Sequence, residues 1–575
     1  MDCRALILTV LAIAACGKVD EAPEGNPSPP PAEKAPWIVA AAHPLAVDAG
    51  AAVLAEGGSA VDAAVAIQAV LGLVEPQSSG LGGGAFMLHY DASSGDVTAY
   101  DGREMAPASV VPEVFYTDEG EPMSFFEAVT SGRAVGVPGT VAVLDLAHRE
   151  HGALPWQRLF EPAEGFARDG FAMPQRLRDS LDRFASFRKD PQAAIYLTEE
   201  GAVKAYGETV QNLPYAKSVQ EIAAGGAAAF YSGEIAQAII DRVNGVTGLE
   251  TLTLEDFANY RPEKREAVCT VTFDRRVCSM PPPSSGGVTL LQILKLYELT
   301  AGDAPLDEGL LAYIEASRLA YADRNRFLGD PTAMGTDGLS AGDLTARLVS
   351  DAYLRNRAQL IGDVPAETVE PGDPDGLLLK EGRIDDWSYE VPATSHFSVR
   401  DGEGNIVSMT TTVEIAFGSQ IMAAGMVLNN QLTDFSRVPY DDEGRLAVNA
   451  PGAGKRPMSS MTPSLVFDRD GTPLIAIGSP GGPAIIGYVA RPLIQHLGTG
   501  IPLSEAAVAP HVVVPRGTVT VEEGATELAA QAEALGYEVR QRSLASGLYG
   551  FALGADGSVD LVSDPRREGT ARMED

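Results

Sequence analysis

Hydroxyl side chains gather on two facing segments of one expected hairpin, "VPATSHFSVRDGEGNIVSMTTT", residues 391–412. Alternating β-branched and apolar residues predict two strands, and the Asp-Gly-Glu-Gly run between them is typical of a turn. Folding the hairpin about Glu403 places Thr394 opposite Thr412. A Thr-rich strand needs no special explanation, because Thr favours strands. The alternative is that one of these hydroxyls is a nucleophile.

Thr394 could act in this way if it became an N-terminus, since its own α-amine would then activate its hydroxyl without a separate His base. Threonine suits the role because β-branching restricts χ1 and holds Oγ in one direction. Residues 365–393, before the hairpin, are acidic and loop-like, so they would expose the Ala393–Thr394 bond to self-cleavage. Thr412 on the facing strand would hydrogen-bond the nucleophile.

Two helices and a glycine loop are expected early in the chain. Residues 46–56 are helical and stop at Gly57-Gly58, while Ser59 with Asp62 resembles a capping box that opens a second helix to about residue 74. The segment "SSGLGGGAFMLHY" then passes through Gly82–Gly84 into a strand. A nucleotide site is disfavoured, because the loop lacks Gly-Lys-Ser/Thr and follows a helix where a Rossmann glycine loop follows a strand. We interpret these glycines as a close backbone approach.

The order of the remaining elements predicts an α+β fold. Residues 145–170 and 215–244 are helix-rich, and 307–328 form one long helix that ends at Gly-Asp-Pro. After residue 394 strands dominate, with glycine turns at 478–482. The chain shows no repeating βαβ rhythm, which favours α+β layers.

The N-terminus indicates export. In "MDCRALILTVLAIAAC", an apolar run too short to span a bilayer ends in Ile-Ala-Ala-Cys, which resembles a bacterial lipobox. We expect a signal peptide over 1–15, lipid on Cys16, a Pro-rich tether over 16–36 and a periplasmic location. The alternative is an ordinary secretory signal with a chance cysteine. Separately, the net charge of −35 argues against nucleic-acid binding, which needs a basic face.

Cysteine usage agrees with export, and no metal or cofactor is expected. In "CTVTFDRRVC", Cys269 and Cys278 face each other across a hairpin that turns at Phe273-Asp274. A cross-strand disulfide in an oxidising compartment and a pair of reduced, buried cysteines are both consistent with this placement. The seven His residues are scattered without the spacing of metal ligands.

A set of motifs along the chain resembles the γ-glutamyltransferase (glutathione hydrolase) family of Ntn-hydrolases. The set consists of "TSHFSVRDGEGNIVSMTTT", "LNNQLTDFS", "KRPMSSMTPSLVF", "GSPGG", "DGREMAPA", "SMPPPSSGG" and "YADRNRFLGDP", and the resemblance covers roughly 38–570. It implies a four-layer αββα sandwich and a self-processing precursor without a cofactor. The large chain would span 37–393 and the small chain 394–575, and the two would stay together as a heterodimer. The implied reaction moves the γ-glutamyl group of glutathione or a similar donor to water, an amino acid or a peptide.

The resemblance also implies roles for residues around the nucleophile. Thr394 matches the nucleophile and new N-terminus, and Thr412 matches the hydroxyl that orients it. Gly481 and Gly482 match the backbone N–H pair of the oxyanion hole, and small residues let two N–H groups converge where the tetrahedral oxygen develops. Without the resemblance, "GSPGG" is equally consistent with a plain tight turn.

The donor's α-amino acid end would be held by a second set. Arg103 matches the clamp on the α-carboxylate, helped by Ser459 and Ser460, because a planar guanidinium forms bidentate bonds to a carboxylate. Gln431 and Asp434 match the groups that hold the α-ammonium. From the residues alone, Arg103 could equally be a surface or ion-paired residue, and Asp434 a turn or cap.

The chain departs from the pattern at two places. Glu414 stands where familiar family members carry Asn, and an ionised Glu only accepts hydrogen bonds. Beside an α-ammonium this is still favourable, so we interpret Glu414 as an altered donor pocket that leaves the preference for glutathione open. Residues 435–455, which align with the lid over the site, are a few residues short, with Tyr440 as the candidate cover residue.

Two other functions remain open at this stage. The same machinery could serve another acyl group, as in a glutaryl-type β-lactam acylase or a poly-γ-glutamate-processing enzyme. Arg103 together with Asp434 favours an α-amino acid donor over a bare diacid. The third hypothesis is a non-catalytic, anchored binding protein that kept the fold.

Overall fold

The computed structural model describes residues 35–335, 338–374 and 393–574. The expected signal peptide, Cys16, most of the tether and much of the loop before Ala393 lie outside the described residues. Within these ranges, none of the helices combines the length and apolar character needed to cross a bilayer.

Seven antiparallel strands form the first sheet, in which the predicted Thr hairpin occupies the centre. The order is β20 (Thr570–Met573), β1 (Ile38–Ala41), β9 (Ser395–Arg400), β10 (Ile406–Thr412), β2 (Gly84–Tyr90), β3 (Val97–Gly102) and β6 (Glu263–Glu266). Strand β9 is therefore hydrogen-bonded on both sides, by β1 and β10. A residue at its start is held by a buried scaffold.

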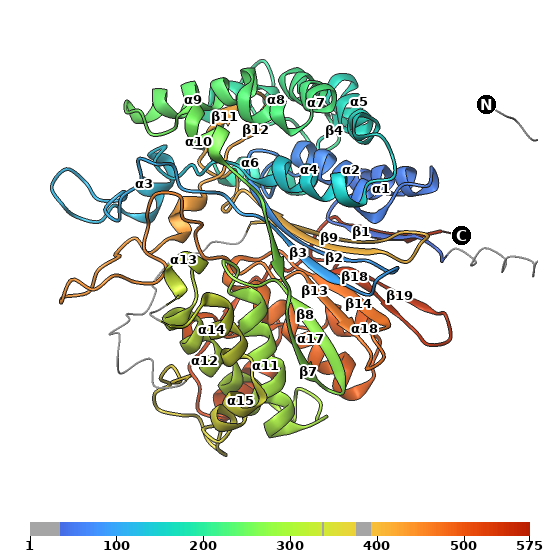
Figure 1. Cartoon of the computed structure of the whole chain (residues 1–575), viewed down its shortest axis with the longest axis vertical. Coiled ribbons are helices and arrows are strands. Elements are labelled where there is room, and N and C mark those ends of the chain that lie inside the picture. Colours follow the sequence, from blue (N-terminus) through green and yellow to red (C-terminus); the bar gives the residue numbers. More distant parts are fainter. Residues whose placement is uncertain (1–34, 336–337, 375–392, 575) are drawn as a thin grey trace, which may run out of the picture. The chain divides into compact units, whose positions relative to one another are not determined.

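Six strands form the second sheet, which packs on the first (Figure 1). The order is β19 (Val559–Ser563), β18 (Tyr549–Leu553), β14 (Pro473–Gly478), β13 (Ser464–Phe467), β8 (Arg275–Ser279) and β7 (Val268–Thr272). Strands β14 and β18 contact β9 across the interface. On β2, Ala85 and Met87 join one hydrophobic core while Phe86 and Leu88 join the other, so the first sheet is buried on both faces.

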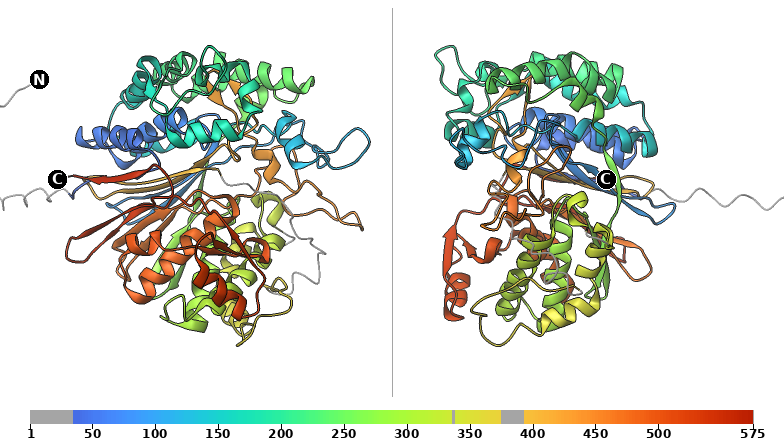
Figure 2. Two further views of the ribbon diagram at one scale, coloured as in Figure 1. Left: turned by 180° about the vertical axis from the view of Figure 1, so that it is seen from behind. Right: turned by 60° about the vertical axis from the view of Figure 1, so that its left-hand side comes forward.

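Helices cover the outer face of each sheet (Figures 1 and 2). The first sheet is covered by α1 (Pro44–Ala55), α2 (Ala60–Val74) and α4 (Thr140–His151), with α5 (Glu161–Asp169), α7 (Leu213–Gly225), α8 (Ala227–Ser232) and α9 (Glu234–Thr247) outside them. The second is covered by α11 (Gly286–Ala301), α12 (Leu310–Phe327), α17 (Ile485–Thr499) and α18 (Leu503–Val508), with the shorter α14 (Ala341–Leu348) and α15 (Asp351–Ala358) beside them. This arrangement confirms the α+β class and the four-layer αββα sandwich.

Local sequence signals explain several of these elements. Ser59 and Asp62 form the predicted capping box at the start of α2, whose residues are all buried. The long helix of residues 307–328 begins later than predicted, at Leu310, because Gly309 supplies its N-cap. The 15-residue helix α17 was not predicted, since residues after 394 were expected to be mainly strands.

Both predicted hairpins are present with the expected register. In the first, Thr411 pairs with Ser395, which brings Thr394 beside Thr412. In the second, Cys269 pairs with Cys278 and the two form a disulfide, which decides between the two alternatives for these cysteines. Phe273 and Asp274 at its tip have φ angles of 48° and 60°, as a two-residue turn of this kind requires.

Candidate active site

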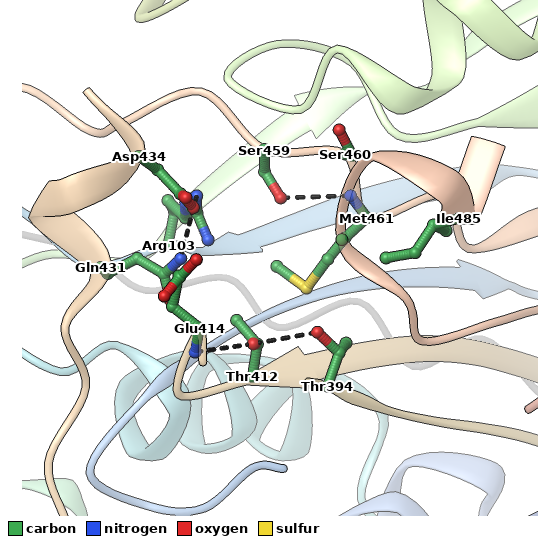
Figure 3. A pocket seen from close by; sticks show the side chains of 11 residues that line it. Arg103, Thr394, Thr412, Glu414, Gln431, Asp434, Ser459, Ser460, Met461 and Ile485 are labelled. Atoms are coloured by element: carbon green, nitrogen blue, oxygen red, sulfur yellow. Dashed lines mark hydrogen bonds and ion pairs between the residues drawn. The ribbon is translucent and has the colours of Figure 1, made fainter. Parts of the chain in front are cut away.

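A pocket opens at the start of β9, and it contains most of the residues that the sequence singled out (Figure 3). Its lining consists of Arg103, Thr394, Thr412, Glu414, Gln431, Asp434, Ser459, Ser460, Met461, Gly482 and Ile485. Ionic and amide side chains gather at one end, the two threonines lie at the middle, and Met461 and Ile485 supply apolar surface on the other side.

The two threonine hydroxyls are in direct contact. Thr394 Oγ1 lies 3.1 Å from Thr412 Oγ1, and the backbone N–H of Glu414 donates to Thr412 Oγ1 over 2.9 Å. Because Thr412 Oγ1 already accepts this N–H, its own proton can be directed at Thr394 Oγ1. Such a bond stabilises negative charge on the Thr394 oxygen as it attacks a carbonyl.

The backbone at Thr394 is strained in the uncut chain. Its φ angle is 120°, in a region that β-branched residues rarely adopt. The preceding residue, Ala393, is buried. Strain of this type is held in place by surrounding structure and concentrates at functional sites. Cleavage between the two residues would release it.

The glycine turn after β14 supplies free backbone donors beside the threonines. Gly481 and Gly482 have φ angles of 139° and 59°, and neither N–H donates to an acceptor within the described part of the chain. Gly482 lines the pocket, whereas Gly481 does not. A Cβ at Gly481 would approach Tyr488 Cε2 to 2.5 Å, so this position requires glycine for space as well as for conformation.

Arg103 and Asp434 form a buried ion pair at the ionic end. Arg103 is fully buried, and its Nη2 donates to Asp434 Oδ2 over 2.6 Å and to the Met458 carbonyl over 2.7 Å. Arg103 Nε donates to the Pro457 carbonyl over 3.0 Å. The ion pair that was one alternative for Arg103 is therefore observed. It does not remove Arg103 from the site, because Arg103 and Asp434 both line the pocket.

Gln431 completes this end of the pocket. Its Nε2 donates to Asp434 Oδ2 over 2.6 Å, while its Oε1 is buried and has no donor among the residues described. An acceptor of this kind costs free energy until a donor arrives. It suits a ligand that brings N–H groups.

Ser459 and Ser460 line the pocket but their hydroxyls are engaged within the protein. Ser459 Oγ accepts the N–H of Met461 over 3.1 Å, and Ser460 Oγ accepts from Arg324 Nη2 over 2.9 Å. Arg324 Nε also donates to Ser285 Oγ over 2.8 Å. Sequence reasoning quoted the motifs "YADRNRFLGDP" and "SMPPPSSGG" without assigning these two residues, which support the serine segment.

Glu414 lies at the ionic end, and Tyr440 does not. The Glu414 carboxylate accepts from Asn430 Nδ2 over 2.5 Å, and the residue has a positive φ of 84°. Tyr440 does not line the pocket; its hydroxyl donates to Glu113 Oε1 over 2.7 Å in an exposed contact. The structure therefore gives no cover over Thr394 from Tyr440, whose hydroxyl is engaged with Glu113.

Glu104, which sequence reasoning missed, is a buried acid behind the pocket. Both of its carboxyl oxygens lack hydrogen-bond partners among the described residues, and Oε2 lies 3.9 Å from Arg103 Nη1. Burial raises the pKa of Glu104 to about 8, against the opposing effect of Arg103. The raised pKa favours the neutral carboxyl near pH 7. Its place in "DGREMAPA", next to Arg103, was the available signal.

The described residues include no cluster of three or more His, Cys, Asp or Glu side chains arranged to hold a metal ion. Nucleophile, hydroxyl partner, N–H donors and ionic end are all supplied by the chain itself. Together with the two stacked sheets between helical layers, a threonine at the start of a central strand defines the class of N-terminal nucleophile hydrolases.

Comparison with known proteins identifies the family. Residues 46–573 match the family model described as gamma-glutamyltranspeptidase, so the chain belongs to this family. It is 36% identical over 487 residues to the "Glutathione hydrolase proenzyme" of Bacillus subtilis strain 168, covering 83% of this chain and 80% of that protein. The protein of the same name from Escherichia coli K12 is 35% identical over 546 residues, covering 92% and 90%.

Solved structures show the same fold. A cephalosporin acylase from Bacillus halodurans superposes with a TM-score of 0.79 and 24% identity, covering 96% of this chain and 99% of that one. Helicobacter pylori gamma-glutamyltranspeptidase gives a TM-score of 0.51 and 32% identity, covering 57% of this chain and 92% of that one. The first similarity concerns the fold alone.

Proposed function

We propose that this protein is a self-processing γ-glutamyltransferase and glutathione hydrolase with Thr394 as its nucleophile. The observation that carries the proposal is one pocket in which Thr394 contacts Thr412, while Arg103, Asp434, Gln431 and Glu414 form an ionic end. Membership of the gamma-glutamyltranspeptidase family supports the same activity.

Self-cleavage comes first in this mechanism. Thr394 Oγ attacks the Ala393 carbonyl carbon, the Thr394 nitrogen leaves with a proton, and an ester joins Ala393 to the Thr394 side chain. Water then hydrolyses the ester, which frees the Ala393 carboxylate and the Thr394 hydroxyl. The positive φ of Thr394 supports this step, because cutting the bond relieves the strain.

The same hydroxyl then takes the γ-glutamyl group. The new α-amine of Thr394 accepts the Oγ proton, Oγ attacks the donor's γ-carbonyl, and the amine of the leaving group receives the proton. Gly481 and Gly482 offer N–H groups to the tetrahedral oxygen, and Thr412 donates to Thr394 Oγ1. Water or an amino acid amine attacks the resulting γ-glutamyl ester and regenerates the enzyme.

The ionic end would hold the α-amino acid part of the donor. Arg103 and the Ser459–Ser460 segment face the α-carboxylate, and Gln431 Oε1, Asp434 and Glu414 face the α-ammonium. Two carboxylates beside one buried guanidinium match a zwitterion better than a bare diacid such as a glutaryl group. This favours a γ-glutamyl donor over a glutaryl β-lactam or a poly-γ-glutamate chain lacking a free α-amine.

Intact mass and N-terminal sequencing of the purified protein test the proposal. We expect a small chain of about 19 kDa that begins at Thr394, from the 60.3 kDa precursor. Thr394→Ala should stay one chain and lack activity on γ-glutamyl anilides. A mature N-terminus elsewhere would refute the mechanism, and an uncut, inactive wild type would favour an anchored binding protein.

We also propose that the enzyme is a periplasmic lipoprotein, anchored through Cys16 by the 16–36 tether. The lipobox-like "IAAC" supports this. Cys16→Ser should abolish labelling by a fatty acid and move the protein from the membrane to the soluble fraction without loss of activity. Membrane retention in Cys16→Ser would contradict the anchor.

A further inference from the structure

Buried charged groups that do not line the pocket contact Thr394 and its neighbour. Arg567 Nη1 donates to the Thr394 carbonyl oxygen over 2.8 Å. The Ser395 hydroxyl donates to Glu75 Oε2 over 2.7 Å, and Arg176 Nε lies 3.6 Å from Glu75 Oε1. These contacts hold the residue on each side of the Thr394–Ser395 peptide bond, and the proposed mechanism has not used them.

Arg567 also binds the segment that supports the glycine turn. Its Nε and Nη2 donate to the Ala545 carbonyl over 3.3 and 3.0 Å. The N–H of Gly547 donates to Ser479 Oγ over 3.2 Å, and Ser479 precedes Gly481 by two residues. A Cβ at Gly547 would come within 2.7 Å of Arg567 Cδ, so this packing is close. The guanidinium is therefore fixed in position relative to Thr394.

We propose that Arg567 is a positioning residue that keeps the α-amine of Thr394 in its neutral form after self-cleavage. This inference rests on the proposed role of Thr394 as the N-terminal nucleophile. An amine can accept the Oγ proton only when it is not protonated. An ordinary α-amine, with a pKa of about 7.7–8.0, is mostly charged at neutral pH. A cation fixed on the carbonyl of the same residue disfavours the charged amine.

Other titratable groups surround this position. They come from the end of α2, from α6 (Gln175–Arg183), α17, β18, the C-terminal segment and the pocket: Glu75, Arg176, Tyr488, Tyr549, Asp564, Glu568, Arg103, Glu414 and Asp434. Burial raises the pKa of Glu75, so this nearest carboxyl carries less negative charge than an exposed one. Burial lowers the pKa of Arg567 to about 9, which leaves it cationic at neutral pH.

The pH profile of kcat/KM tests this, with a γ-glutamyl anilide as the probe substrate. Arg567→Gln keeps a donor for the Thr394 carbonyl but removes the charge. For unit charges about 6 Å apart at an effective dielectric constant of about 20, partly offset by Glu75, the acidic limb should rise by about one to two pH units. Arg567→Lys keeps the charge, so its acidic limb should stay near that of the wild type even if kcat falls.

Arg566→Gln is the matched control. Arg566 is the adjacent arginine, but it binds Glu522 and Asp564 and makes no contact with Thr394 among the described residues. Loss of its charge should leave the acidic limb within about 0.3 pH units, because the charge lies farther from the amine and nearer to solvent. Its stability can fall without affecting this readout.

The inference would be overturned by an unshifted acidic limb in Arg567→Gln, by an equal shift in Arg567→Lys, or by an equal shift in Arg566→Gln. Arg567→Met is the second neutral variant if Arg567→Gln does not self-cleave. Failure of both to cleave would assign Arg567 to folding and would also overturn the inference. A wild-type N-terminus other than Thr394 would instead refute the proposed function, so the two failures are distinguishable.

Discussion

Glu414→Gln tests the feature that separates this pocket from the family pattern. The carboxylate of Glu414 is oriented by Asn430 Nδ2 at 2.5 Å and lies in the same pocket as Gln431 and Asp434. Glutamine has the same shape and keeps an oxygen for Asn430, but it carries no charge. The substitution therefore removes the charge that we propose faces the donor's α-ammonium.

The size of the loss follows from the position of the carboxylate. Glu414 is buried, at 5% exposure, so water screens it less than a surface charge. A charge-assisted hydrogen bond here contributes roughly 1–3 kcal/mol after desolvation is counted. This corresponds to a fall in kcat/KM of about 5- to 150-fold for donors with a free α-amine. Asp434 remains beside the ammonium, so the loss should be incomplete.

The assay compares γ-glutamyl and glutaryl anilides on the same purified variant. The glutaryl group lacks the α-amine, so Glu414→Gln should leave its kcat/KM unchanged or improve it. Self-cleavage should proceed normally, because no donor is bound during that step. Equal losses with both donors would refute the reasoning and would place Glu414 in support of Thr412 through the backbone. No loss with either donor would show that the carboxylate does not contact the ammonium.

Three further predictions follow from the site and its supports. Arg103→Lys cannot keep all three bonds to Asp434 and the two carbonyls. The transition-state stabilisation measured by kcat/KM for γ-glutamyl anilides should therefore fall by roughly 2–4 kcal/mol, while gels should show that self-cleavage continues. An uncut variant would assign Arg103 a structural role. Because the pKa of Glu104 is raised to about 8 from 4.5, its neutral carboxyl stabilises the folded protein at low pH, and this stability is lost as pH rises from about 4.5 to 8. Glu104→Gln should therefore increase the free energy of unfolding at pH 7 by on the order of 3 kcal/mol, measured by denaturant titration, with no gain at pH 4; a gain equal at both pH values would contradict the raised pKa. Replacing both Cys269 and Cys278 by Ser opens a short loop and should cost roughly 2–3 kcal/mol of stability. The Tm of the double variant should be lower than that of the oxidised wild type and should match that of the wild type treated with reductant. If neither the variant nor the reduced wild type has a lower Tm, the result would argue against the disulfide.

Much of the fold was predictable because its signals are local. The Ser59–Asp62 capping box and the Asp-Gly-Glu-Gly turn each specify backbone geometry within a few residues, and both elements formed as predicted. Helix α17 was missed because it contains Gly487 and Pro492, residues that disfavour a helix interior, in a part of the chain expected to be mainly strands. Strand order was not predicted, since pairing β9 with β1 joins residues far apart in the chain; only the layered architecture came from the family resemblance.

The residues of the site were predictable as a set, but their bonds were not. Sequence assigned Arg103 to the donor's α-carboxylate and Asp434 to its α-ammonium, whereas the structure pairs the two side chains directly at 2.6 Å. Arg567 lies outside the motifs and could not be identified from residue spacing, because it contacts Thr394 from 173 residues away in the chain. Tyr440 was assigned as a cover residue from the family resemblance, whereas in the structure its hydroxyl binds Glu113.

The arrangement separates the chemistry of cutting from the chemistry of donor selection. Thr394, Thr412 and the glycine turn form one group, fixed by β9, β10 and β14, and it is needed whenever Thr394 Oγ attacks a carbonyl. Arg103, Gln431 and Asp434 form another, bound to one another before any donor arrives. Because the second group is already ordered, a zwitterionic donor pays little to organise it, while a donor lacking the ammonium leaves Gln431 Oε1 buried and unsatisfied. On the proposed assignment, discrimination between donors arises from the polar atoms that the wrong donor leaves unpaired.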